Sequence, residues 1–410
     1  MVDLISYKKI TMNKSTHFSG QPTFCQIINL IPKDIIANHV VEFATDRYCK
    51  KFNTFHHLLT MLFSCFGNCT SLREIVTGMR AMEGKLANSG MRHLPTRSTL
   101  SDANAKRSSD VFESIYLSLR EHFQSLFPDS PYSEEMLYVI DSSVVTLFQE
   151  IFNGSGSSQS DGRRKGGLKM HMALPLNEQT PCVVHIGDGA DNDLVFHKHL
   201  TLPAGSTVIF DRGYRSYPQF NLWTEMDIRW VTRLNERSHF KLIEEKPVNK
   251  KQKALGVTKD MEVELGFPQK KTQHVRARII HYTDIETNRQ LKFLTNDLIS
   301  HANIICDLYA KRWNIELLFK RLKQNMPLKY FLGDNQNAIR IQIWCALIAD
   351  LLLNFIRKQV KRKWTFSSIA SLVRLHLFNY LNLCSFLENP EKSRIVSDHR
   401  DISQLKLKWT

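Results

Sequence analysis

The chain has 410 residues, with 55 Lys or Arg against 40 Asp or Glu, so its net charge is +15 and its pI is about 9.4. This length suggests about two to four domains, and the basic excess is typical of nucleic-acid binders. The eight cysteines follow no zinc-ligand spacing. The longest apolar run, 345–356, is too short for a bilayer, and no signal peptide is evident, so we expect a cytoplasmic protein without membrane contact.

Residues 1–130 are predicted to form a helical domain. A capping-box pair, Ser71 with Glu74, starts one of its helices. A proline-containing turn leads into a short polar helix within 92–107, which carries Arg97, Lys106 and Arg107. Such a helix suits DNA recognition, although on this feature alone an ordinary surface helix is the alternative. Apolar residues at helical spacing predict further helices over 34–44, 54–66 and 109–127.

Residues 131–235 alternate between strand and helix patterns. The first three strands can be hairpin neighbours and the later ones need crossovers, which predicts a mixed sheet. Two apolar runs end in Asp141 and Asp211, where each aspartate is aimed at the rim of the sheet. The predicted strands cover 137–145, 168–176, 181–188, 207–213 and 228–235.

The stretch 153–167 is rich in glycine and serine and carries Arg163, Arg164 and Lys165. It is flexible by composition. It could close on DNA, and a plain linker is the equal alternative.

Residues 236–300 are predicted to be a β-rich insertion of four strands with charged turns. Residues 301–325 form a core helix, and residues 326–410 return to helical patterning. The apolar segment 338–356 must pack on the core or on a second subunit, and the end of the chain is a loose tail.

The segment 309–323, YAKRWNIELLFKRLK, has one polar face if it is a single helix. One carboxylate then lies among cations and a phenol, which suits a metal held close to bound phosphates. A solvated helix with ion pairs four residues apart is the alternative. The residues of this polar face are Tyr309, Arg312, Glu316, Lys320 and Lys323.

Asp141, Asp211 and Glu316 together form a candidate three-carboxylate site. Such a set can hold two divalent ions about 3.5–4 Å apart, which clamp the attacking and leaving oxygens of a phosphoryl transfer. Other carboxylates are assigned elsewhere: the group at 188–193 to a turn, Asp161 to a loop and Asp307 to a helix cap.

The order of the three carboxylates resembles the DDE transposases. The spacing Tyr309-x2-Arg312-x3-Glu316-x6-Lys323 matches the Tyr-x2-Arg-x3-Glu-x6-Lys signature of the insertion sequence four family, and Trp313 also occurs in its better-known members. The segment DRGY at 211–214 is similar to the block around that family's second aspartate. The resemblance covers roughly 135–325 and extends more loosely to 70–107.

The resemblance implies an α/β ribonuclease H-like catalytic core. It also implies a bacterial insertion-sequence transposase that cleaves element ends and joins the 3′-OH to target DNA. Mg²⁺, replaceable by Mn²⁺, is the expected cofactor, with two ions per site. The expected partners are double-stranded DNA with terminal inverted repeats, target DNA and a second copy of the chain. The polar face of 309–323 would hold phosphates.

Two other functions stay open on the sequence. One is a metal-dependent nuclease without strand transfer, and the other is a non-catalytic DNA-binding derivative. Residues 236–300 contain no tryptophan, whereas well-studied members of the family carry one in this insertion that captures a flipped base. This departure leaves open whether a DNA hairpin forms.

Overall fold

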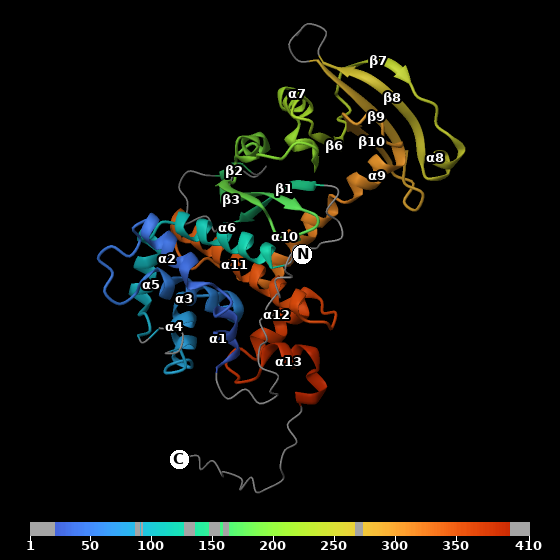
Figure 1. Cartoon of the computed structure of the whole chain (residues 1–410). Coiled ribbons are helices and arrows are strands. Elements are labelled where there is room, and N and C mark those ends of the chain that lie inside the picture. The colour runs from blue at the N-terminus through green and yellow to red at the C-terminus, as the bar shows by residue number, and fades with distance from the viewer. Residues whose placement is uncertain are drawn as a thin grey trace, which may run out of the picture.

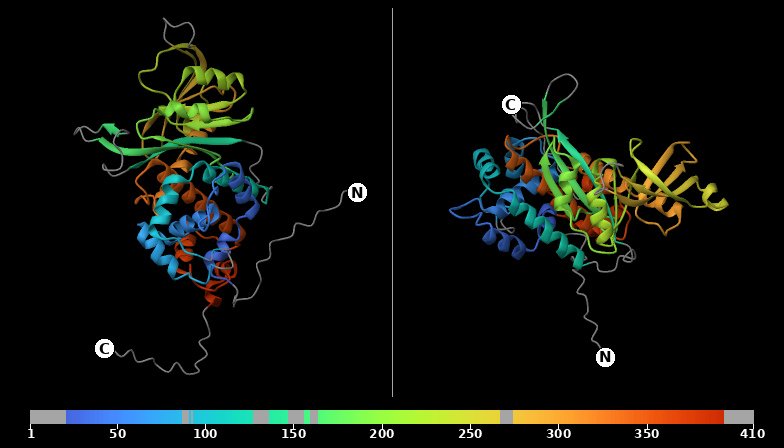
Figure 2. Two further views of the ribbon diagram at one scale, coloured as in Figure 1. Left: turned by 90° about the vertical axis from the view of Figure 1, so that its left-hand side faces the viewer. Right: turned by 90° about the horizontal axis from the view of Figure 1, so that it is seen from above.

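The computed structural model describes residues 21–86, 91, 93–126, 136–146, 156–158, 164–266 and 274–393. A body of helices lies below a long twisted sheet, and the last strands of the sheet extend away from the helices (Figure 1, Figure 2). The protein is therefore of mixed α/β class with a large mixed sheet, as the sequence predicted.

The first strands of the sheet position the two aspartates. Spatially they lie in the order β4-β3-β1-β5-β6. Pairing is antiparallel from β4 to β1 and parallel from β1 to β6, so the prediction of hairpins followed by crossovers is confirmed. The strands are β1 (Leu137–Thr146), β3 (Arg164–Pro175), β4 (Val183–Asp188), β5 (Thr207–Phe210) and β6 (Arg229–Arg233).

Both faces of this sheet are covered, which explains why its strands are almost continuously apolar. Val139 and Ile209 face the helical body, whereas Ile140 and Phe210 pack on the opposite side with the helix α7. The crossovers contain the short 3-10 helices η2 (Asp193–His199) and η3 (Arg212–Tyr214), followed by α7 (Tyr217–Glu225).

Part of the glycine-rich stretch is ordered, contrary to the prediction of a flexible loop. Strand β2 (Gly156–Ser158) pairs antiparallel with the beginning of β3, so that Ser157 lies opposite Lys165. Glycine and serine composition predicted flexibility, but pairing with β3 satisfies the backbone groups of this segment. Arg163 lies outside the described residues.

The β-rich insertion has the four predicted strands, and it continues the core sheet. Strand β10 pairs with β6, which joins the insertion to the core in the order β6-β10-β9-β8-β7. A short helix, α8, was not predicted; Asn249 and Gln252 form its capping box. The elements are β7 (Phe240–Glu245), α8 (Lys250–Ala254), β8 (Val257–Leu265), β9 (Val275–Thr283) and β10 (Gln290–Thr295).

The predicted core helix over 301–325 is two helices, α9 (Ala302–Ala310) and α10 (Trp313–Asn325). The chain between them stays right-handed, with φ −62° at Lys311 and −54° at Arg312. Amide groups here bond to carbonyls three residues earlier, for example Arg312 to Tyr309 at 3.0 Å. The turn is therefore wound more tightly than an α-helix.

The helices from the two ends of the chain share one core. Backbone amides of Thr23 and Phe24 bond to the carbonyls of Asn379 and Leu377. The N-terminal helices are α1 (Thr23–Ile28), α2 (Lys33–Glu42), α3 (Thr54–Gly67), α4 (Leu72–Arg80), α5 (Arg97–Lys106) and α6 (Asp110–Ser125). The C-terminal elements are α11 (Gln336–Gln359), α12 (Phe366–Leu375), α13 (Leu383–Glu388) and η4 (Pro390–Ser393).

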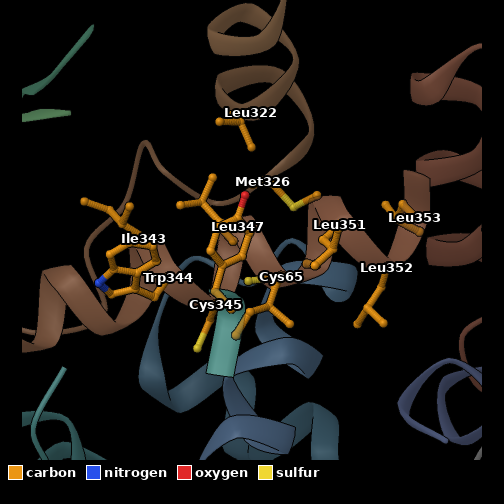
Figure 3. Close-up of a cluster of buried hydrophobic side chains, with 14 of the residues drawn as sticks. Cys65, Leu322, Met326, Ile343, Trp344, Cys345, Leu347, Leu351, Leu352 and Leu353 are labelled. Atoms are coloured by element: carbon orange, nitrogen blue, oxygen red, sulfur yellow. The ribbon is translucent and has the colours of Figure 1, made fainter. Parts of the chain in front are cut away.

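Helix α11 is the centre of this body. Its buried side chains, among them Cys345 and Leu347, form one apolar cluster with Cys65 of α3 and with Leu322 and Met326 from the end of α10 (Figure 3). Among the described helices, α11 alone is long and apolar enough to cross a membrane, and almost all of it is buried inside the protein. It therefore packs on the core, which is one of the two predicted positions. The N-terminal helices α3, α5 and α6 pack against it.

Candidate active site

Asp141 and Asp211 are neighbours on adjacent parallel strands. Ile140 of β1 lies opposite Phe210 of β5, so the next residues of the two strands are the aspartates. Parallel pairing aligns the carboxyl ends of strands at one edge of a sheet, where ligands bind in α/β folds. The register therefore places both carboxylates at one rim.

Helix α10 brings the third carboxylate to this rim. Its apolar side, with Ile315, Leu318 and Leu322, is buried in the helical body. Glu316 then faces the end of β1. Arg312 joins the two elements: Nη1 donates to Asp141 Oδ2 at 2.9 Å, and Nη2 donates to Glu316 Oε1.

Two further side chains reach Asp211 Oδ1. The Tyr309 hydroxyl donates to it at 3.4 Å, and Arg233 Nη2, from the end of β6, lies 3.6 Å away. Tyr309 is buried, with its ring 5.0 Å from that of Phe293 and 5.8 Å from the Arg312 guanidinium. These contacts hold the Tyr309 phenol beside Asp211.

Burial raises the pKa of Asp141 to about 6. The backbone amide of Ser142 and the Arg312 guanidinium act in the opposite direction by stabilising the carboxylate. The negative charges of Asp211 and Glu316 raise the pKa further. Asp211 and Glu316 therefore lie close enough to Asp141 to influence its ionisation.

The remaining residues of the polar face of 309–323 spread out from this centre. Lys320 is exposed, and Lys323 Nζ donates to the Val144 carbonyl at 3.2 Å. Burial lowers the pKa of Lys323. Trp313 is 58% exposed at the start of α10.

Arg321 lies on the other side of α10 and pairs with the buried Asp350. Its Nε and Nη2 donate to the two carboxylate oxygens at 2.8 and 2.7 Å. Its guanidinium also lies 4.8 Å from the Phe366 ring. Arg321 therefore fastens α10 to α11.

Sequence reasoning missed a polar cluster beside the aspartates. Asp193, assigned to a turn, begins η2, and its Oδ1 accepts from Ser142 Oγ at 3.1 Å and lies 2.8 Å from Lys169 Nζ. His171 Nδ1 lies 2.8 Å from the Tyr214 hydroxyl. No spacing in the chain signals these contacts, because they join separate strands. Asp307 lies within α9 and not at a cap.

A family model described as the transposase DDE domain matches residues 132–352, which contain all three carboxylates. This chain belongs to the DDE transposase family. The match also covers the insertion and the first part of α11.

Curated relatives of the transposase agree with this family. The y4zB protein of Sinorhizobium fredii, named as a transposase, is 30% identical over 63% of this chain and 71% of its own length. A protein of Synechocystis sp., named as the transposase for insertion sequence element IS4SA, is 27% identical over 70% of this chain and 78% of its own. A solved piggyBac transposase synaptic complex with hairpin DNA aligns at 10% identity over 94% of this chain and 82% of that chain, with a TM-score of 0.42, too weak to indicate a shared fold.

The N-terminal part of the transposase matches a domain of unknown function over residues 19–92. Arg97 and Lys106 are exposed on α5. Arg107 is buried, and its Nη2 donates to the Phe52 carbonyl at 2.8 Å. The structure thus contradicts the prediction of Arg107 as a DNA contact. Arg164 and Lys165 lie at the start of β3, where they pair with β2.

The carboxylates of the transposase could hold a hard cation, since all their donor atoms are oxygen. The side chains of Asp141, Glu316 and Asp211 are 19%, 31% and 38% exposed, so each can be reached from solvent. Within the described residues, however, no three His, Cys, Asp or Glu side chains are gathered closely enough to form a metal site. The Arg312 guanidinium lies between Asp141 and Glu316.

Proposed function

We propose that this transposase belongs to a bacterial insertion sequence. It binds the two ends of the element, hydrolyses the strand at each end, and joins the freed 3′-OH to target DNA. The observation that carries the proposal is the Arg312 bridge between Asp141 and Glu316, with Asp211 beside it. Relatives named as transposases for insertion sequence elements support the same reading.

We assign the catalytic core to the ribonuclease H-like fold. The support is the strand order β4-β3-β1-β5-β6, with antiparallel pairing on one side of β1 and parallel pairing on the other. Asp141 lies in the central strand of this core, and Asp211 follows its parallel neighbour.

Asp141, Asp211 and Glu316 would hold divalent ions, which we take to be two Mg²⁺ with Mn²⁺ as a substitute. All-oxygen ligands beside substrate phosphates suit Mg²⁺. When bound, such ions supply a nucleophile at neutral pH and neutralise charge on the attacking and leaving oxygens. Arg312 is hydrogen-bonded to both Asp141 and Glu316. It must therefore release at least one of these carboxylates when they hold a cation.

The cations of 309–323 would then position the DNA. Arg312 is close enough to transfer its hydrogen bonds from carboxylate to phosphate without leaving the site, and a guanidinium suits both partners. Lys320 and Lys323 extend the positive surface along α10. Tyr309, at the end of α9, lies beside Asp211. The exposed Trp313 ring offers a stacking surface for a nucleobase.

Other DNA contacts would come from the N-terminal helices and the sheet edge. Arg97 and Lys106 face solvent on α5, which we take as the helix that contacts the terminal repeat. Arg163, Arg164 and Lys165 would add further positive charge for DNA binding. Transposition joins two ends at once, so we propose that two copies of the chain act together. We expect them to act in the cytoplasm, where the DNA lies.

A strand-transfer assay tests the function. Linear DNA that ends in the element's terminal repeat is mixed with the protein, MgCl₂ and a supercoiled target plasmid. Joined products support a transposase. Cleavage without joining would identify a nuclease, and end binding without cleavage would identify a non-catalytic derivative.

A further inference from the structure

The helix η2 contacts residues that follow each of the two aspartates. From its first residue, the Asp193 carboxylate accepts from Ser142 Oγ at 3.1 Å, and Ser142 directly follows Asp141. The same carboxylate is paired with Lys169 Nζ at 2.8 Å, on the neighbouring strand β3. A hydrogen bond and an ion pair thus connect Asp193 to β1 and β3 close to Asp141.

On its other side, Asp193 lies against the loop after Asp211. A Cβ built at Gly213 would be 2.3 Å from Asp193 Oδ2, so only glycine allows this approach. From the end of the same helix, His197 Nε2 donates to the Tyr214 carbonyl at 2.8 Å. Helix η2 therefore holds the turn η3 at two points.

We infer that Asp193 is a positioning residue that sets the separation of Asp141 and Asp211. Asp211 follows the last residue of β5, so the strand alone does not fix its carboxylate. Asp193, which is hydrogen-bonded to Ser142 and packed against Gly213, limits that freedom. The Lys169 ammonium compensates the charge of Asp193, which suits a structural bridge and not a further metal ligand. This inference rests on the proposed role of the trio.

The test uses the full-length protein and MnCl₂ alone, titrated by calorimetry without DNA. Asp193→Ala should weaken Mn²⁺ binding about tenfold or more, as loss of a supporting residue typically does. End-DNA binding should change by less than about twofold. Asp191→Asn is the matched control, since Asp191 caps the same loop through the Asp188 amide without touching Ser142 or Gly213. Asp193→Asn and Gly213→Ala provide second variants if Asp193→Ala does not fold.

An Mn²⁺ isotherm of a folded Asp193 variant equal to that of the parent would overturn the inference. Loss of thermal stability alone, with unchanged metal binding, would do the same. Asp141→Asn separates this result from failure of the proposed function: if that variant also binds Mn²⁺ like the parent, the trio is not the metal site.

A separate observation concerns the loop between α2 and α3. Most of its exposed residues are basic or aromatic, namely Arg47, Tyr48, Lys50 and Lys51, and the other two are Ala44 and Cys49. Tyr48 is 87% exposed and has φ +66°, a left-handed conformation that is costly for a tyrosine. The loop's acid, Asp46, already accepts from the Thr54 amide and hydroxyl at 2.6 and 2.7 Å. Within the described part of the chain, no ion pair involves these three cations.

Arg107 fastens this loop to α5. It caps the end of that helix, its Nη2 donates to the Phe52 carbonyl, and it lies 3.7 Å from Asp46. Arg107 therefore connects the segment that carries the exposed cations of the loop to the end of α5. We propose that the loop binds the sugar–phosphate backbone of the end DNA beside the groove contacted by α5, which rests on the proposed DNA-binding function.

Gel-shift titrations of the full chain test the loop. Lys50→Ala with Lys51→Ala should weaken binding to end DNA and scrambled DNA equally and reduce the slope of log K against log salt by about 2. Tyr48→Ala should lower affinity without changing the slope. Lys361→Ala with Lys363→Ala, an exposed pair before α12, is the control. An unchanged slope and affinity in the Lys50/Lys51 variant would overturn this proposal, whereas failure of the parent to bind end DNA would overturn the proposed function.

Discussion

Arg312 and Asp141 meet through a hydrogen bond of 2.9 Å from Nη1 to Oδ2, although 171 positions separate them in the chain. The same guanidinium reaches Glu316, one helical turn further along α10. Two of the three proposed catalytic carboxylates thus meet at one cation, which also belongs to the Tyr-x2-Arg-x3-Glu-x6-Lys pattern. This relationship makes Arg312 the most informative position to change.

Arg312→Ala should reduce strand cleavage by about 10²-fold or more, because it removes a charged donor at the reacting phosphate. Arg312→Lys should also be poor, since a single ammonium cannot make two directed pairs. Initial rates of cleavage on end DNA measure this. Lys311→Ala, an exposed neighbour, should stay within about twofold of the parent. Equal losses at both positions would mean that overall charge, and not placement, matters.

Asp141→Asn, Asp211→Asn and Glu316→Gln should each abolish cleavage and strand transfer while end-DNA binding is retained. Metal ligation needs the charged oxygens, whereas the phosphate contacts lie on other side chains. Cleavage and gel-shift assays on the same preparations separate the two effects. Asp307→Asn, exposed on α9, is the control. A variant that cleaves near the parent's rate would remove its residue from the trio.

Arg321→Ala should destabilise the protein by about 3–5 kcal/mol, because the buried Asp350 carboxylate would lose its partner. From the sequence alone this substitution is expected to have a mild effect on catalysis, since Arg321 lies off the polar face of 309–323. Urea unfolding measures the change. Adding Asp350→Ala should recover part of the loss, because the coupled pair is non-additive. Two purely additive losses would show that the pair is not coupled.

His57 should make stability depend on pH. Burial lowers the pKa of His57 to about 3 from 6.5, with the charge of Arg107 acting in the same direction. The unfolded chain therefore binds a proton below pH 6.5 that the folded protein does not. Above that pH, His57 has no effect on the free energy of unfolding. Below it, the titration of His57 lowers the free energy of unfolding by about 1.4 kcal/mol per pH unit. Unfolding free energies of the parent and His57→Gln between pH 7 and 4.5 should diverge as pH falls; parallel curves would contradict this.

A fragment of residues 1–130 should not fold by itself. Helices α3, α5 and α6 bury apolar side chains against α11, which the fragment lacks. Removing α11 would expose a contiguous apolar surface, so we expect a poorly structured or aggregating fragment. Circular dichroism with thermal unfolding measures this. A cooperative transition in the isolated fragment would show that the N-terminal helices have a sufficient core.

Periodicity and local chemistry were enough to predict most of the individual elements. The strands that carry Asp141 and Asp211, the four strands of the insertion and the main helices follow from side-chain patterns that any local segment displays. The spacing of Arg312 and Glu316 likewise indicated that these two side chains meet, because one helical turn relates them. These features depend only on residues close in sequence.

The contacts between distant segments were decided by tertiary packing. Only the parallel register of β1 and β5 brings Asp141 beside Asp211, and only η2 adds Asp193. In the sequence, Arg107 and Arg321 resemble ordinary surface cations. The fold buries Arg107 and pairs Arg321 with Asp350. The packing of the N-terminal and C-terminal helices around α11 likewise cannot be predicted from any short segment. Which apolar faces meet is set by the total burial of the whole chain, and no short window of sequence contains that information.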